Sequence, residues 1–179
     1  MSAIEKDSVS EQLRSMVTRM SYLRQAPEDL STIRCPNSHF LPDLSGAKLP
    51  HAGPFSPAAK FHNCMSDMFK WLATADDPDL DPTSITNPDR KMLPDDCDIQ
   101  FTHADLNPVN IMVSKDSPCH VLAILDWEQS GWYPAYWEFC KAELTIEPHS
   151  EWQAVYWPKI LGVPGCVISF YSYVSSFAS

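Results

Sequence analysis

Glycine is scarce in this chain of 179 residues. There are only five glycines, and none of them belongs to a glycine-rich loop. In loops of that kind the missing side chains let backbone amides approach phosphate groups closely. The sequence therefore lacks the usual glycine-rich phosphate-binding loop.

Basic residues are also few. Thirteen lysines and arginines stand against 23 aspartates and glutamates, which gives a formal net charge of −10. Binding to DNA or RNA through the phosphate backbone needs a basic face, so we do not expect a nucleic-acid partner. The charge is compatible with cationic substrates. Hydrophobic residues make up 44% and charged residues 20% of the chain, as in soluble globular proteins.

The cysteines lack the CxxC pairs and the histidine spacing of zinc sites. This favours free thiols in a reducing compartment over a disulfide framework or a zinc site, and it predicts a cytoplasmic protein. The polar amino terminus, MSAIEKDSVSEQ, has no apolar stretch typical of a signal peptide. The last twenty residues carry no charge, but Pro164 and Gly165 interrupt them, so we expect no membrane span. The six cysteines are Cys35, Cys64, Cys97, Cys119, Cys140 and Cys166.

Two helices are predicted in the first half of the chain. Ser8 and Glu11 have capping-box spacing, which predicts an amphipathic helix over residues 9–25 that ends before Pro27. Ser56-Pro57 is typical of a helix start and predicts a second helix reaching about residue 74. Its expected buried stripe consists of Phe61, Met65, Met68, Phe69 and Leu72.

The remaining segments are less regular. Prolines and glycines in residues 31–55 predict a loop, and eight aspartates with four prolines in 75–98 predict an acidic, solvated loop. A short strand is expected at 99–101. Farther on, GWYPAYWEFCKAEL predicts a turn at Gly131 and Pro134 followed by a helix, and EWQAVYWPKI predicts a helix that ends near Pro158.

One group of residues points to reaction chemistry. Residues 103–110 read HADLNPVN, and Asp126 follows in the run AILDWE. Magnesium prefers hard oxygen ligands together with water and phosphate oxygens, and Asp105, Asn110 and Asp126 are side chains of that type. An aspartate in a loop can also orient a hydroxyl group and take its proton. The pattern predicts a magnesium and phosphoryl-transfer site.

A predicted β-hairpin connects the parts of this site. The apolar runs NIMV at 110–113 and HVLAIL at 120–125 are separated by the turn-rich SKDSPC. Asn110 stands at the start of one strand and Asp126 just past the end of its partner. Antiparallel pairing brings these two ends together, so we expect both residues to reach one ion.

Each site residue also has a simpler interpretation. Asp105 could cap a local turn, Asn110 could satisfy backbone groups at a strand start, and Asp126 could cap the turn after the hairpin. Aromatic residues nearby could form a core or a wall, or a box that binds a cation through its ring faces. These residues are Trp127, Trp132 and Trp137.

The segments FTHADLNPVNIMV and AILDWEQSGWYPAYWEFCKAE resemble the aminoglycoside phosphotransferase and choline kinase-like family, most closely its fungal-type members. The resemblance is strongest over residues 99–143. It implies an α+β, mostly helical fold, namely the C-terminal lobe of a protein-kinase-like fold with a β-hairpin carrying the metal site. The chain would form a single partial domain over 1–179, with the catalytic loop and metal-binding hairpin at 99–130 and the acidic loop at 75–98.

The resemblance also implies a role for each residue. Asp105 would be the catalytic aspartate that accepts the proton of the acceptor hydroxyl. Asn110 and Asp126 would hold Mg²⁺ and contact the co-substrate ATP. His103 would give structural support, and Glu128 would contact a second ion or its waters. The acceptor would be a small hydroxylated molecule, often a cationic one.

The match does not extend to an amino-terminal lobe. Such a lobe would bring a lysine on a strand with a paired glutamate, and Lys6 and Glu5 stand in the wrong setting for this. The sequence therefore predicts a phosphotransferase that is incomplete without a small lobe, which missing sequence or another chain would have to supply. The alternatives are a catalytically inactive fragment acting as a binding or interaction module, and a metal-dependent hydrolase that uses the same acids without ATP.

Overall fold

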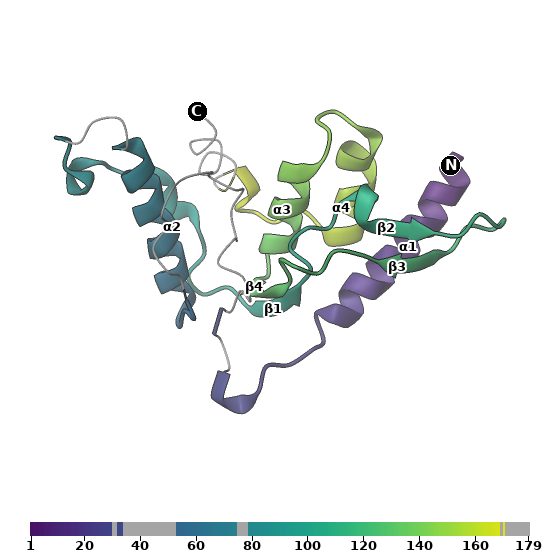
Figure 1. The fold of residues 1–179 in the computed structure, drawn as a ribbon, viewed down its shortest axis with the longest axis horizontal. Helices are drawn as coiled ribbons and strands as arrows, with labels where there is room; N and C mark the ends of the chain where they lie inside the picture. The colour runs from purple at the N-terminus through teal and green to yellow at the C-terminus, as the bar shows by residue number, and fades with distance from the viewer. Residues whose placement is uncertain (30–31, 34–52, 75–78, 169, 171–179) are drawn as a thin grey trace.

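The computed structural model of the protein describes residues 1–29, 32–33, 53–74, 79–168 and 170. Within these residues it has four α-helices and two antiparallel sheets of two strands each (Figure 1). This arrangement agrees with the α+β class and is compatible with a partial kinase-like domain. The elements are α1 (Ala3–Met20), α2 (Ala58–Ala73), β1 (Ile99–Thr102), β2 (Ile111–Val113), β3 (Val121–Ile124), β4 (Gly131–Pro134), α3 (Trp137–Thr145) and α4 (Trp157–Leu161).

Helix α1 begins earlier than predicted. The sequence holds two capping boxes six residues apart, and the structure uses the first, in which Ser2 and Glu5 bond reciprocally. The predicted start at Ser8 and Glu11 is wrong, because the earlier box lets the helix extend by more than a turn before its first buried residue, Val9. The helix also ends earlier than predicted, at Met20.

Helix α2 confirms the predicted second helix. Its Phe61 and Met65 are buried in the core. Several predicted features lie outside what the structure describes. They are the side chains of Met68, Phe69 and Leu72, and residues 34–52 of the predicted first loop, which include Cys35. Between α2 and β1, two short 3₁₀-helices cover Pro82–Ser84 and Pro88–Met92.

The hairpin is confirmed: β2 and β3 pair antiparallel with Ile111 opposite Ile124. The predicted turn at Gly131 and Pro134 is wrong, because these residues form β4, which pairs with β1. Pro134 lies at the end of the strand, opposite Ile99, where a missing backbone N–H is tolerated. The two sheets thus differ in connection. Strands β2 and β3 are consecutive and form a hairpin, whereas β1 and β4 pair although β2 and β3 lie between them in the sequence.

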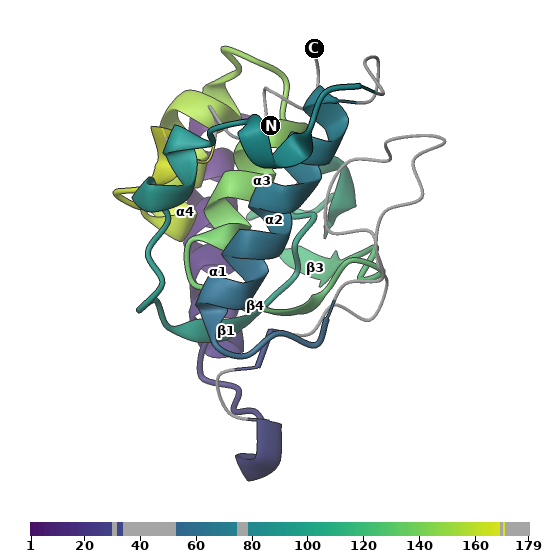
Figure 2. The ribbon, with the colours of Figure 1, turned by 90° about the vertical axis from the view of Figure 1, so that its left-hand side faces the viewer.

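Helix α3 lies at the centre of the molecule, with α2 on one side and α1 on the other (Figures 1 and 2). Its Trp137 belongs to one core cluster together with Phe61 of α2 and Tyr133 of β4. Its Ala142 belongs to a second cluster together with Leu13 of α1. One helix therefore joins both cores.

Helix α4 corrects the predicted helix end at Pro158. A π-helical turn at Trp152–Tyr156 runs directly into α4, and Pro158 lies in the first turn of α4. A proline is tolerated there because the first amides of a helix have no carbonyl partner in it. The helix ends at Gly162, whose φ of 69° is a backbone conformation that favours glycine.

Two findings bear on the expected environment of the protein. Across the described ranges, no helix has the length and apolar character needed to cross a membrane. The five cysteines whose positions are described, all except Cys35, carry free thiols.

Candidate functional site

Two loops form the candidate site, and the strands at the ends of one loop pair with the strands at the ends of the other. The first loop leaves β1 after Thr102 and enters β2 at Ile111, while the second leaves β3 and enters β4 at Gly131. Thr102 is paired with Gly131, and Ile111 with Ile124. In addition, the Leu125 amide donates to the Asn110 carbonyl at 2.8 Å. The pairing therefore places the segment around Asp105 beside the segment around Asp126.

Asn110 is bonded directly to Asp105. Its side-chain nitrogen Nδ2 donates to the Asp105 backbone carbonyl at 2.9 Å and to the carboxylate oxygen Oδ2 at 3.2 Å. The amide group thus orients the Asp105 carboxylate. Because the nitrogen is used in this way, the oxygen Oδ1 is the atom that Asn110 can offer to a metal ion.

His103 bridges the two loops. It is fully buried, and its Nε2 lies 2.8 Å from the carbonyl oxygen of Leu125, so Nε2 carries the proton and donates. Its Nδ1 then accepts a hydrogen bond from the Asp105 amide at 3.2 Å. Burial lowers the pKa of His103 below its ordinary value, which favours this neutral form. These contacts support a bracing role for His103.

Two residues of the site have strained backbones. Ala104 has a φ of 64° and Asp126 a φ of 61°, in the left-handed region that side chains other than glycine seldom adopt. Such a conformation costs on the order of 1–3 kcal/mol and persists only where the surrounding structure enforces it. We therefore expect the surrounding structure to hold the backbone firmly at Ala104 and at Asp126.

Glu138 of α3 holds the first loop and was not found from the sequence. Its carboxylate accepts hydrogen bonds from the backbone amides of His103 at 2.6 Å and Ala104 at 3.1 Å. The side chain is almost fully buried, and burial raises its pKa to about 7. An acidic residue among the aromatic residues of WYPAYWEF, on a predicted core helix, is the one sequence signal that could have pointed to it.

The three tryptophans do not gather in one place. Trp137 is fully buried in the core and stacks on Tyr133. Trp127 lies partly exposed beside the site, against Phe101 and His103, and Trp132 packs edge-on against Phe101. The core interpretation holds for Trp137, whereas Trp127 forms part of the wall next to Asp126. Glu128 is exposed on the same loop.

The oxygen donors of the site suit magnesium in kind. Asn110 Oδ1 and the exposed Asp126 carboxylate are the hard ligands that Mg²⁺ takes, usually one or two per site with phosphate oxygens and water. In the described portion of the chain, no three His, Cys, Asp or Glu side chains gather closely enough to hold a metal ion by themselves. The protein would thus supply only part of a coordination shell.

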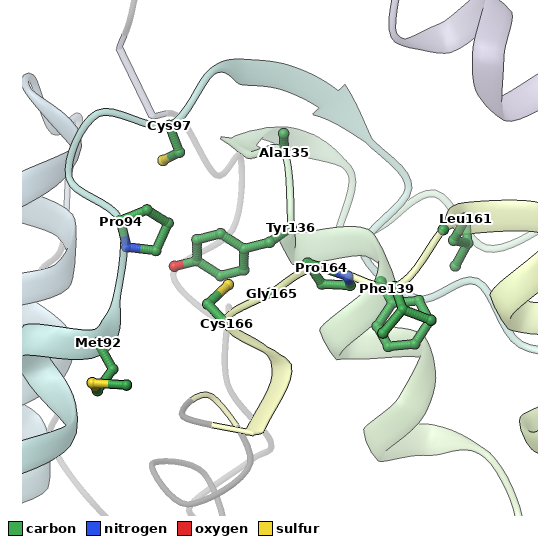
Figure 3. Close-up of a pocket in the computed structure, with 12 residues that line it drawn as sticks. Met92, Pro94, Cys97, Ala135, Tyr136, Phe139, Leu161, Pro164, Gly165 and Cys166 are labelled. Atoms are coloured by element: carbon green, nitrogen blue, oxygen red, sulfur yellow. The ribbon is translucent and has the colours of Figure 1, made fainter.

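A separate cavity of about 660 Å³ lies beside the N-terminal end of α3 (Figure 3). Tyr136 and Phe139 form one wall, and Cys97 and Cys166 face it from the segments before β1 and after α4. The Tyr136 hydroxyl is bonded to the buried His62 at 2.7 Å. None of the residues of the HADLNPVN motif lines this cavity.

The comparison with protein families decides what this site belongs to. The sequence profile of the phosphotransferase enzyme family matches residues 39–157, which is more than half of the chain and includes the whole motif. The chain belongs to this family. Comparison with curated proteins and with solved structures gave no match.

Membership of the phosphotransferase enzyme family confirms the resemblance at the level of the family. It implies phosphotransferase activity in general, and members of this family generally use ATP and Mg²⁺. The profile does not separate subfamilies, so the similarity to fungal-type and choline kinase-like members stays a prediction. The roles of the individual site residues likewise remain to be proposed.

Proposed function

We propose that this phosphotransferase moves the γ-phosphoryl group of ATP to a hydroxyl group of a small molecule, in a magnesium-dependent reaction. The observation that carries the proposal is the bond from Asn110 Nδ2 to the Asp105 carboxylate, formed where the hairpin places Asn110 beside the segment of Asp126. The family match favours this activity over a catalytically inactive binding module.

Asp105 would act as the base. One of its carboxylate oxygens, Oδ2, is held by Asn110. The other would accept the proton of the acceptor hydroxyl while the hydroxyl oxygen bonds to the γ-phosphorus and the bond from phosphorus to the ADP oxygen breaks. His103 and Glu138 fix the backbone on both sides of Ala104, so the carboxylate is positioned before the substrate arrives.

Asn110 Oδ1 and the Asp126 carboxylate would hold the magnesium ion, which when bound offsets the charge of the phosphate oxygens. Glu128 lies on the exposed loop next to Asp126 and would contact a second ion or its waters. The net charge of −10 favours a cationic acceptor. The free thiols favour a reducing compartment such as the cytoplasm.

The test is the substitution Asp105→Asn. Removing a general base of this kind lowers turnover by about 10²–10⁴-fold, while the side-chain volume and the hydrogen bond to Asn110 can be retained. Turnover is measured as ADP released in the presence of a panel of amino alcohols, aminoglycosides and sugars, and nucleotide affinity is measured by calorimetry.

The matched control is Asp116→Asn, which changes an exposed aspartate in the turn of the hairpin. This variant should keep wild-type turnover. If Asp105→Asn also keeps wild-type turnover, Asp105 is not the base. Because the sequence predicts a missing small lobe, the same assay is run on the chain alone and on the chain supplied with such a lobe. If neither form transfers a phosphoryl group to any acceptor at any magnesium concentration, the proposed activity is wrong.

A further inference from the structure

Lys141 is a buried cation on α3, one helical turn after Glu138. Only 3% of its surface is exposed, as for Glu138. Lysines are seldom buried to this degree, because removing an ammonium group from water is costly unless polar partners replace the water. Its positive charge lowers the pKa of Glu138, opposing the effect of burial, so the two charges lie close to each other.

The ammonium group of Lys141 reaches the second loop of the site. Its Nζ donates to the side-chain oxygen Oε1 of Gln129 at 3.0 Å. Gln129 is held a second time through its backbone, because the hydroxyl of the buried Tyr133 donates to its carbonyl at 3.3 Å. Gln129 is therefore tied to both α3 and β4.

The loop between Asp126 and Gly131 depends on such ties. Trp127 fixes the start of the loop by donating from Nε1 to the Ile124 carbonyl at 2.7 Å. Asp126 itself has a left-handed backbone, which the chain leaves readily if the loop is released. A contact that holds Gln129 thus limits the conformations open to Asp126, three residues before it.

We infer that Lys141 is a positioning residue that acts through Gln129 to hold the Asp126 loop, as Glu138 holds the Asp105 loop. Two charged side chains on one turn of α3 then set the distance between the two halves of the site. The contacts alone support the role of Lys141 in holding the loop. The expected effect of Lys141 on magnesium binding rests on the proposed function.

The first test measures amide hydrogen exchange by mass spectrometry on the full chain. Lys141→Met keeps the length of the side chain and removes its charge. It should speed exchange in residues 126–130 by about tenfold, the effect expected from losing a hydrogen bond to a charged group. Glu138→Gln should instead affect residues 103–105. Lys141→Arg, which keeps the cation, should change exchange less than Lys141→Met does.

Two controls separate positioning from general loss of stability. Lys159→Met removes an exposed lysine and should leave residues 126–130 unchanged. Gln129→Met should reproduce the effect of Lys141→Met, and the double variant should exchange no faster than either single variant. The inference is overturned if Lys141→Met speeds exchange equally in α1 and β1, or leaves residues 126–130 unaffected.

The second test is the magnesium dependence of turnover. Lys141→Met should raise the magnesium concentration for half-maximal rate about tenfold, in line with the loosening of the loop, and leave the KM of the acceptor unchanged. A role in stability alone would lower the amount of active protein and would not shift the magnesium dependence. If the wild-type chain has no turnover even when a small lobe is supplied, the proposed function fails, and the exchange experiment still decides the role of Lys141.

Discussion

At the scale of single residues, the candidate site depends on buried charges that hold backbone atoms. Glu138 is the most constrained of them, since two amides donate to it and the surrounding core excludes water. Its pKa of about 7 means that its carboxyl group changes charge near neutral pH. The charge of the group that accepts the hydrogen bonds of the Asp105 loop therefore depends on pH.

This link gives a prediction for the stability of the protein. The native state binds the Glu138 proton more tightly than the unfolded chain does, because the native pKa is about 7 and the ordinary value is 4.5. The stability that this proton contributes is full below the ordinary pKa and is lost as the pH rises to about 7. The loss amounts to about 3 kcal/mol over that range.

Glu138→Gln cannot titrate and should lack this decrease. Between pH 4.5 and 7.5 the free energy of unfolding of the wild type, measured in urea, should thus fall by about 3 kcal/mol relative to that of the variant. Glu143→Gln removes a carboxylate from the same helix and serves as the control, which should follow the wild type. Parallel curves for the wild type and Glu138→Gln would contradict the assignment.

At the scale of elements, the end of α4 depends on the backbone of one glycine. Gly162 combines a φ of 69° with a ψ of 150°, a region that is open almost only to glycine. A Cβ placed there would meet open space, so the cost of a substitution is one of backbone strain and not of packing.

Gly162→Ala should therefore destabilise the protein by about 1–3 kcal/mol. Gly165→Ala is a matched control, because a Cβ at Gly165 also meets open space and its backbone carries no such strain. Thermal unfolding of the two variants should give a lower Tm for Gly162→Ala only. Equal Tm values would show that the loop after α4 relaxes at no cost.

The sequence predicted the elements that short-range patterns determine. The β2–β3 hairpin and α2 were found because their signals lie within a few residues, and the hairpin led directly to the meeting of Asn110 with the Asp126 segment. The β1–β4 sheet was missed, because Gly131 and Pro134 look like turn residues until the pairing with β1 is known. Glu138 and Lys141 were missed for the same reason, since their partners lie in loops that precede α3, 35 residues away for His103 and 12 residues away for Gln129.

At the scale of the whole molecule, α1 supports the site although it precedes the segment that matches the family. Gln12 donates to the Cys119 carbonyl at 3.2 Å and accepts from the Val121 amide at 3.0 Å, so α1 is bonded to the start of β3. Leu13 packs in the second core cluster with Leu106 of the first loop. The helix is thus part of the same folding unit as the motif.

Leu13→Ala should consequently destabilise the whole protein. Leu13 is fully buried, and replacing a buried leucine by alanine costs about 2–5 kcal/mol. Leu23→Ala changes a half-exposed leucine after the same helix and should cost far less. Urea unfolding followed by tryptophan fluorescence checks both, because Trp157 belongs to the same core cluster as Leu13. A single cooperative transition is expected for each variant.

The crossed pairing of the four strands limits where the chain can change in length. Each of the two site loops begins in one sheet and ends in the other, so an added or deleted residue in any strand would shift the register of its partner and turn side chains to the opposite face. The turn at residues 114–120 lies outside this constraint, because it connects β2 and β3 at the end away from Asn110 and Asp126. Insertions and deletions among related sequences should accordingly gather in that turn and spare the four strands.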